Sequence, residues 1–227
     1  DLASPALNGQ TRLSSFAVGD TLGALDDRLR VTLGARHQNI QSKSWAYGTH
    51  TASIGYDDSR VSPAVGVVYK LDKQVSLYGN YIEGLVQGDT APTTSNGHAV
   101  INGGNALSPY VSRQQEIGAK FDTGRLGFGV AAFSTERPRA YVNGNYAYVA
   151  EGKDRHRGLE LTAFGDAVRG LRILGGVTLL DAKQQETGSS TTDGKRVIGV
   201  PKFQGTLGAE WDLPLLRGLA LDARVVH

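Results

Sequence analysis

Hydrophobic and polar residues alternate with a period of two along much of the chain. In segment 203–213 one face carries Phe203, Leu207 and Trp211, while the other carries Gln204 and Glu210. This period predicts β-strands, whose successive side chains point to opposite faces. The same alternation occurs in 28–37, 114–122, 157–166 and 219–225, in more mixed form in 61–71, 73–83, 125–136 and 170–182, and weakly within 11–24. The pattern predicts roughly ten strands in five hairpins and no helix.

The connections between these strands alternate between short and long. Tight turns, about 45–50 residues apart, are predicted near 26–27, 71–73, 122–124, 166–170 and 214–218. Longer polar connections lie between them at 41–60, 84–111, 137–154 and 183–202. Short turns on one side of a membrane and long loops on the other are typical of bacterial outer-membrane β-barrels.

The polar face of the strands is compatible with two architectures. A soluble sandwich would turn it to bulk water, whereas a large barrel would turn it to a wet lumen. In a lumen, charged residues of neighbouring strands can pair; the candidates are Glu116, Lys120, Glu160, Glu210, Asp222 and Arg224. The runs match the ~9–11 residues of a membrane-crossing strand rather than the ~5–6 of a sandwich strand. We therefore predict an all-β, transmembrane, antiparallel up-and-down barrel.

Aromatic residues at two strand ends can be interpreted in two ways. Trp211 and Phe121 lie on the apolar face beside predicted turns. They fit the aromatic girdle of a membrane barrel. Two ordinary half-buried aromatics would give the same pattern.

Composition narrows the class of protein. The 227 residues contain no Cys, which excludes disulfides and thiolate zinc sites. The net charge is +2 and no basic cluster suggests a nucleic-acid partner. No apolar run approaches the ~20 residues of a spanning helix. The chain starts in a polar stretch and stops within a strand pattern, so we expect a piece of a longer protein.

Sequence motifs for catalysis are missing. There is no Gly-x-Ser-x-Gly elbow and no P-loop, and the five His residues lack the i, i+4 spacing of a helical zinc site. We predict neither an enzyme nor a resident metal. The charged run 153–157 could contact an anionic ligand, but we favour a loop-to-strand boundary at the level of the lipid headgroups.

Aromatic residues are concentrated in two of the long connections. Trp45, Tyr47 and Tyr56 lie in one, and Tyr141, Tyr146 and Tyr148 lie in another. Such residues offer a rigid surface with a polar tip to a ligand, or they anchor loops and pair across extended hairpins. Segment 89–105 is rich in Gly, Thr, Ser and Asn, which predicts a mobile loop.

A set of short motifs resembles a known family. The series consists of segments 62–70, 77–81, 107–109, 115–120 (Gln-Glu-Ile-Gly-Ala-Lys), 157–161 (Arg-Gly-Leu-Glu-Leu) and 199–203. In order and spacing it is similar to the barrel of TonB-dependent ferric-siderophore receptors of the ferrichrome or hydroxamate type. Each motif is weakly specific, but the ordered set is strong, and the resemblance covers nearly the whole chain from about Asp26 onward.

The resemblance implies a 22-stranded barrel around an N-terminal plug, in the outer membrane of a Gram-negative bacterium. Residues 1–227 would be a partial barrel domain, without the plug, the TonB-contact segment or the last strands. An open sheet leaves unpaired backbone groups at both edges, which lipid cannot satisfy. We therefore expect no native pore from this piece alone.

The resemblance also implies a mechanism. A ferric siderophore binds at the extracellular side, and TonB, acting through the absent N-terminal segment, supplies energy for import. Iron arrives already chelated, so no cofactor and no direct iron ligand is expected. The candidate ligand-binding residues are Trp45, Tyr47, Tyr81, Tyr141, Tyr146 and Tyr148. The alternatives are a passive porin, a soluble β-rich protein, or TonB-dependent uptake of haem, cobalamin or a glycan.

Overall fold

The computed structural model describes residues 7–45, 51–214, 216 and 218–227. Within them, ten strands form one antiparallel sheet in the order β1-β2-β3-β4-β7-β8-β9-β10-β11-β12, and β5 and β6 form a separate small hairpin. The strands are β1 (Gly9–Ala24), β2 (Leu29–Trp45), β3 (Ala52–Lys70), β4 (Val75–Val86), β5 (Thr94–Ser95), β6 (His98–Ala99), β7 (Tyr110–Asp122), β8 (Leu126–Val142), β9 (Tyr148–Val168), β10 (Leu171–Gln185), β11 (Phe203–Asp212) and β12 (Ala220–Val226).

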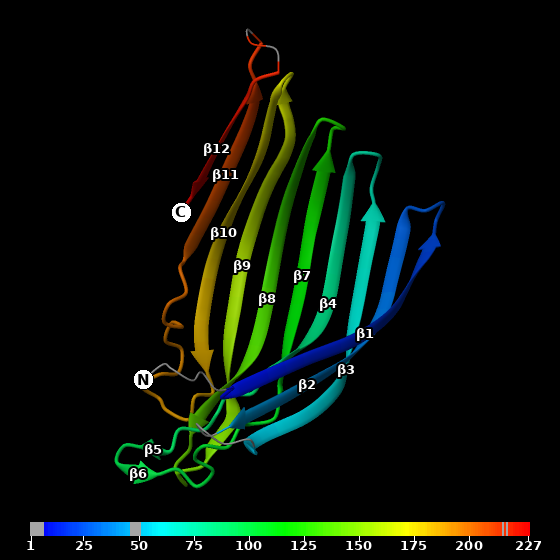
Figure 1. Ribbon diagram of the computed structural model, residues 1–227. Helices are drawn as coiled ribbons and strands as arrows, with labels where there is room; N and C mark the ends of the chain where they lie inside the picture. The colour runs from blue at the N-terminus through cyan, green and yellow to red at the C-terminus, as the bar shows by residue number, and fades with distance from the viewer. Residues whose placement is uncertain (1–6, 46–50, 215, 217) are drawn as a thin grey trace.

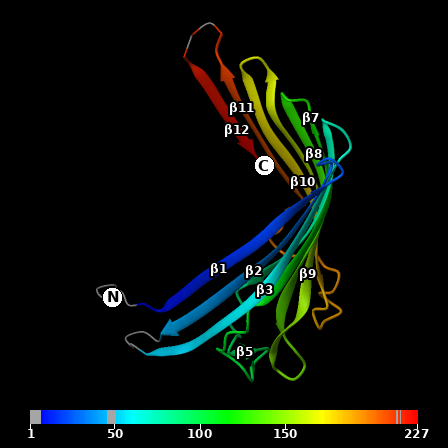
Figure 2. The same ribbon diagram turned by 90° about the vertical axis from the view of Figure 1, so that its right-hand side faces the viewer.

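The sheet is a curved wall whose strands run between a turn end and a loop end. In Figure 1 the short turns lie at the top, and the long loops with β5 and β6 lie at the bottom. Figure 2 shows the wall bent into an open trough, with β1 and β12 at separate edges. The part of the chain that the structure describes contains no helix long and apolar enough to cross a membrane.

The prediction of long connections at 41–60 and 137–154 is wrong, because most of these residues belong to strands. β2 continues to Trp45 and β3 begins at Ala52, while β8 continues to Val142 and β9 begins at Tyr148. Charged side chains within 137–154 instead pair across the extended strands, as in Arg139 with Asp154 at 2.9 Å. The predicted turn at 166–170 is also shorter, because β9 runs to Val168. The other two long connections are loops at 87–109 and 186–202.

In two of the tight turns an aspartate side chain accepts backbone hydrogen bonds. Asp72 Oδ1 accepts from the N–H groups of Gln74 and Val75 at 2.7 and 2.8 Å. Asp122 Oδ1 accepts from Gly124 N–H at 2.7 Å, and Gly124 has a φ of 83° that favours glycine. Local side-chain bonds of this kind replace the ladder where the chain reverses.

The convex face of the sheet is apolar over a band of defined height. On β10 the residues of this face are Leu171, Ile173, Gly175, Val177 and Leu179, and each lies opposite an apolar or glycine residue of β11. The nine residues 171–179 span about 27 Å at roughly 3.4 Å per residue, which matches the ~25 Å apolar band of membrane barrels. Trp211 lies at the turn end of this band, and Phe121 stacks on Phe128 with centroids 6.4 Å apart.

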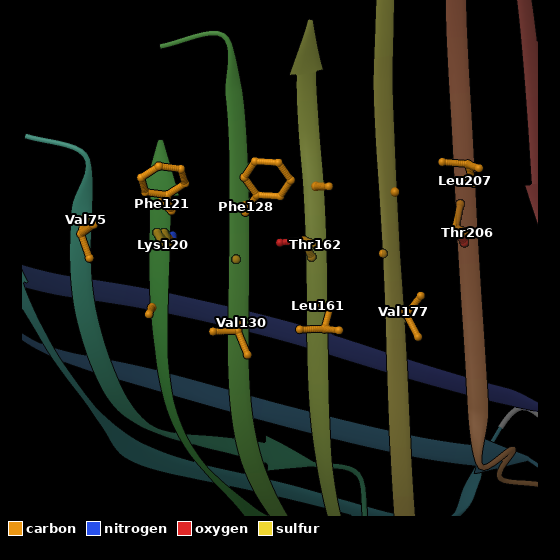
Figure 3. Close-up of a pocket in the computed structure, with 15 residues that line it drawn as sticks. Val75, Lys120, Phe121, Phe128, Val130, Leu161, Thr162, Val177, Thr206 and Leu207 are labelled. Carbon is orange, nitrogen blue, oxygen red and sulfur yellow. The ribbon is translucent and has the colours of Figure 1, made fainter. Parts of the chain in front are cut away.

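Figure 3 views this convex face, with the blue strands near the N-terminus crossing behind the sheet. A shallow groove of about 590 Å³ crosses it, with glycines in its floor and apolar side chains at its rims. Those side chains include Phe121, Phe128, Val130, Leu161, Val177 and Leu207. The groove therefore belongs to the membrane-facing surface.

Leu207→Arg should destabilise the barrel strongly, whereas Thr206→Arg should be tolerated. Leu207 lies in the middle of the apolar band, where an arginine costs about 2–4 kcal/mol. Thr206 immediately precedes Leu207 in the chain, and its side chain belongs to the opposite, polar face of the sheet. The measurement is the folded fraction of the full-length protein in lipid vesicles, read from its heat-modifiable mobility on gels. Equal folding of the two variants would contradict the assignment of the faces.

The concave face carries a polar network across three strands. Tyr78 Oη donates to Glu116 Oε1 at 2.8 Å, and Thr135 Oγ1 donates to Gln114 Oε1 at 3.2 Å. The Lys120 ammonium lies 5.1 Å from the centre of the Tyr78 ring. Among the charges expected to pair across strands, Glu210 forms an ion pair with Arg172 of β10. The wall thus has one apolar and one hydrogen-bonded face.

Aromatic rings on the concave face lie over glycines of neighbouring strands. The rings of Tyr78, Phe164 and Phe133 occupy the space that a Cβ would need at Gly118, Gly127 and Gly158. Such aromatic–glycine pairs cover backbone that has no side chain of its own and fix the register of adjacent strands.

Candidate ligand-binding site at the loop end

The loop 87–109, which the sequence predicts to be mobile, has hydrogen bonds and a small core of its own. Its base is closed by bonds from Leu107 N–H to the Asp89 carbonyl and from Ala91 N–H to the Asn105 carbonyl, at 2.9 and 2.8 Å. Ala91 and Val100 are only 3% and 6% exposed. Polar composition signalled a loop correctly, but it could not show these backbone contacts.

The tip of the β8–β9 hairpin docks on this loop. Asn102 Nδ2 donates to the Tyr148 carbonyl and Asn102 Oδ1 accepts from Tyr148 N–H, both at 2.9 Å. Ile101 N–H donates to the Tyr146 carbonyl at 2.9 Å, and the rings of His98 and Tyr146 lie 4.5 Å apart. One asparagine thus satisfies both backbone groups of Tyr148 and fixes the loop against the hairpin.

Three tyrosines surround Asp89 at the base of the loop. Tyr110 is 5% exposed; its hydroxyl accepts from Asp89 N–H at 3.1 Å. Burial raises the pKa of Tyr110 to about 12, and it also raises the pKa of Tyr56 and of Tyr148. The nearby Asp89 carboxylate acts in the same direction on all three. These hydroxyls are therefore protonated at neutral pH and able to donate hydrogen bonds.

This group, Tyr56, Asp89, Tyr110 and Tyr148, is called the tyrosine cluster below. Tyr110 shares its face of β7 with Gln114 and Glu116, which belong to the polar concave network. The cluster therefore lies where the concave wall meets the loop end. In the part of the chain that the structure describes, no group of three or more His, Asp or Glu could hold a metal ion.

The buried Tyr110 hydroxyl predicts a loss of loop stability at high pH. Its pKa is about 12 in the folded protein and about 10 in an unfolded chain. Because the folded value is the higher one, the stabilisation is complete below pH ~10 and disappears as the pH rises through ~12. The difference in tyrosinate absorbance between wild type and Tyr110→Phe should show one group titrating near 12. A midpoint near 10 would contradict the buried placement.

The second loop, 186–202, follows the outer part of β10. Gln184 N–H donates to the Lys195 carbonyl and Val197 N–H donates to the Ala182 carbonyl, at 2.8 and 3.0 Å. The loop is closed by Asp193 Oδ1, which accepts from Thr187 N–H at 2.7 Å. The Tyr141 ring occupies the space next to Gly188, so it connects the β8–β9 hairpin to this loop.

The predicted ligand-binding residues fall in several places. Tyr148 belongs to the tyrosine cluster, whereas Tyr146 and Tyr141 connect the β8–β9 hairpin to the two loops. Trp45 ends β2, and its N–H donates to the Asn8 carbonyl at 2.9 Å. Tyr47 lies outside the described residues.

Tyr81 lies away from the cluster. In the register of β3 and β4 it is opposite Val65, on the apolar convex face. Its hydroxyl donates to Glu83 Oε1 at 2.6 Å, and Arg113 binds the same carboxylate at 3.2 Å. The alternation of polar and apolar residues around position 81 carried this information, because Tyr81 is in phase with Leu77 and Gly79.

Sequence reasoning missed Tyr110, Asp89 and Asn102 as site residues. Tyr110 could have been found, because it is in phase with Gln114 and Glu116 on the polar face of its strand. No sequence signal shows that Asn102 binds the Tyr148 backbone, 46 residues further along the chain. That contact depends on how two loops pack.

Comparison with known proteins agrees with this architecture. The sequence profile of the family described as TonB dependent receptor-like, beta-barrel, matches residues 3–226. The chain belongs to the TonB-dependent receptor family. This match confirms the predicted all-β membrane barrel and its place in the outer membrane of Gram-negative bacteria, and the family consists of receptors rather than enzymes.

Individual relatives show how much of such a receptor is present. The ferrichrome receptor FcuA of Yersinia enterocolitica is 36% identical over 228 residues, which cover 100% of this chain and 30% of FcuA. The crystal structure of BauA, the ferric preacinetobactin receptor of Acinetobacter baumannii, has a TM-score of 0.76 at 35% identity, covering 96% of this chain and 32% of BauA. The metal-pseudopaline receptor CntO of Pseudomonas aeruginosa is 29% identical over 152 residues, 64% of this chain and 20% of CntO. The match thus covers about a third of the length of FcuA and of BauA and a fifth of the length of CntO.

Proposed function

We propose that this TonB-dependent receptor chain forms part of the wall and the extracellular mouth of a receptor that binds a ferric siderophore and imports it with energy supplied through TonB. The observation that supports the proposal is the similarity to the ferrichrome receptor FcuA, which extends over the whole of this chain and 30% of FcuA. The tyrosine cluster at the concave mouth supplies a surface on which such a ligand would bind.

The chemistry of the cluster suits a chelate whose iron is already enclosed. Protonated tyrosine hydroxyls donate to chelate oxygens, and the rings offer flat area to apolar ligand carbons. The Arg139–Asp154 ion pair, 2.9 Å between Nη1 and Oδ1, adds a charged group at the β8–β9 hairpin. Tyr148 is the sequence-predicted residue that we retain as a direct ligand contact; Tyr141 and Tyr146 would support the loops. The plug, the TonB-contact segment and the other barrel strands belong to the parts of the receptor outside these 227 residues.

The test is ligand binding by the full-length receptor in detergent, followed by quenching of intrinsic fluorescence. Ferric hydroxamate, catecholate and carboxylate chelates are compared, with haem and cobalamin as controls. We expect saturable binding of one ferric chelate class, weakened in Tyr148→Ala and Asp89→Asn. Tyr69→Phe is the matched control, because Tyr69 lies opposite Leu29 and Leu77 on the apolar face. Ion conductance without binding of any chelate would replace the proposal with a passive channel.

A chelate of another metal is the second candidate. This second candidate is supported by the similarity to CntO, which is described as a metal-pseudopaline receptor. That similarity extends over 152 residues. Adding nickel, cobalt and zinc chelates of the same metallophore to the binding assay separates the two. Tighter binding of these than of any ferric chelate would support the second candidate.

A further inference from the structure

The contact between the loop 87–109 and the β8–β9 hairpin uses an asparagine that is followed by a glycine. Asn102 binds both backbone groups of Tyr148, through Nδ2 and Oδ1, at 2.9 Å each. Gly103 packs so closely within the loop that a Cβ would lie 2.9 Å from the Thr93 Cα. The fold therefore needs an amide side chain at position 102 and no side chain at position 103.

An Asn–Gly pair carries a reaction of its own. The peptide nitrogen of the glycine attacks the Cγ of the asparagine; a new C–N bond forms, the Cγ–Nδ2 bond breaks, and the proton of the attacking N–H leaves with the nitrogen as ammonia. Water then opens the cyclic imide at either carbonyl, which gives aspartate or isoaspartate. Glycine favours the attack because the absence of a Cβ leaves its nitrogen unhindered and its backbone free to rotate.

The docked loop restrains both reacting groups of the Asn102–Gly103 pair. Turning the carboxamide towards the Gly103 nitrogen would break its two bonds to Tyr148. The Gly103 N–H itself donates to the Val100 carbonyl at 2.9 Å. The pair can therefore react only after the loop has left the hairpin, which is a local opening of the structure.

A second Asn–Gly pair in the same loop has no such restraint. Asn96 and Gly97 form the two-residue turn between β5 and β6, with φ of 49° and 81°. Both residues are exposed, and the Asn96 side chain forms no hydrogen bond with the part of the chain that the structure describes. Asn96 therefore reports how fast such a pair reacts in this loop without docking.

We propose that Asn102–Gly103 is a deamidation site that reacts only when the loop has left the hairpin, and that its product prevents the loop from docking again. An aspartate at position 102 still accepts from Tyr148 N–H, but it has no N–H for the Tyr148 carbonyl. Two oxygens would then face each other where the Nδ2 bond of 2.9 Å was. Isoaspartate adds a methylene to the backbone beside Gly103, where a single Cβ already has no room. The docked form is thus lost progressively over the life of the receptor.

The gating is tested by comparing deamidation of the full-length receptor in detergent with deamidation of the same protein unfolded in guanidinium chloride. Mass-spectrometric fragmentation of the loop peptide assigns the product to Asn96 or to Asn102. Because opening breaks two hydrogen bonds, we expect folding to slow the reaction at Asn102 about 30-fold. The rate at Asn96 should change little. Equal slowing of the two residues by folding would overturn the proposal.

The effect of the product is tested with two variants of the full-length receptor. Asn102→Asp reproduces the aspartate, and we expect proteinase K to cleave the loop about 10-fold faster than in wild type, because one hydrogen bond is replaced by two facing acceptors. Asn96→Asp adds the same charge to the same loop and should be cleaved like wild type. Equal cleavage of the two variants would show that the product still docks, which contradicts the proposal. Neither measurement uses a siderophore, so both results are independent of the proposed function.

Discussion

Gly88→Ala is expected to weaken siderophore binding about 10- to 100-fold while leaving the barrel folded. A Cβ at Gly88 would overlap the Leu107 carbonyl oxygen and come within 2.6 Å of the Ser108 carbonyl oxygen. These are backbone atoms that close the base of the loop 87–109, next to the Asp89–Leu107 hydrogen bond. Overpacking of this kind costs about 1–3 kcal/mol.

The strain is relieved if the loop leaves its docked position. Opening the base would separate Asp89 from Tyr110 and release the contacts of Asn102 with Tyr148. A ligand that needs the docked loop must then bind against an unfavourable pre-equilibrium, which reduces its apparent affinity by the fraction of docked receptor. Proteinase K, which does not need a Lys or Arg and so can cut this loop, should also cleave it faster than in wild type.

Gly84→Ala is the matched control for this measurement. It lies four residues earlier on β4, and a Cβ there would meet no atom within 4 Å. Affinity and cleavage rate are measured in both variants of the full-length receptor. Unchanged affinity in Gly88→Ala, together with faster cleavage, would show that the loop takes no part in ligand binding.

Gly165→Ala should impair folding of the barrel by about 2–4 kcal/mol, from backbone strain and overpacking together. Gly165 has a φ of 121°, in a region that residues with a side chain rarely adopt. A Cβ would also overlap the Arg125 carbonyl oxygen, which accepts a hydrogen bond from Asp166 N–H at 2.8 Å. The substitution therefore strains β9 and the adjoining β7–β8 turn at once.

The folding yield of the full-length receptor from urea into detergent micelles measures this effect. Gly208→Ala serves as the comparison, because its nearest atom beyond its chain neighbours would lie 3.6 Å from the new Cβ, an ordinary contact. We expect a large loss of the heat-modifiable folded band for Gly165→Ala and almost none for Gly208→Ala. Equal yields would mean that Gly165 does not hold this backbone conformation in the full barrel.

The outcome at positions 137–154 shows where reasoning from composition fails. Charged residues such as Arg139 and Asp154 were assigned to a loop, but they pair across β8 and β9 beyond the apolar band. Outside the hydrocarbon, a strand needs only a hydrogen-bonded neighbour and tolerates charge on both faces. Polarity therefore marks where the membrane ends and does not mark where a strand ends.

The sequence by itself determined the strands, most turns, the two faces and the family, because side-chain alternation in a strand has a fixed period of two. It also placed Tyr148 among the candidate ligand contacts. Only the tertiary structure decided that Tyr110 and Asp89 meet and that Asn102 holds the backbone of Tyr148. These relations depend on strand register and loop packing, which join residues distant in the chain by contacts that leave no local pattern in the sequence.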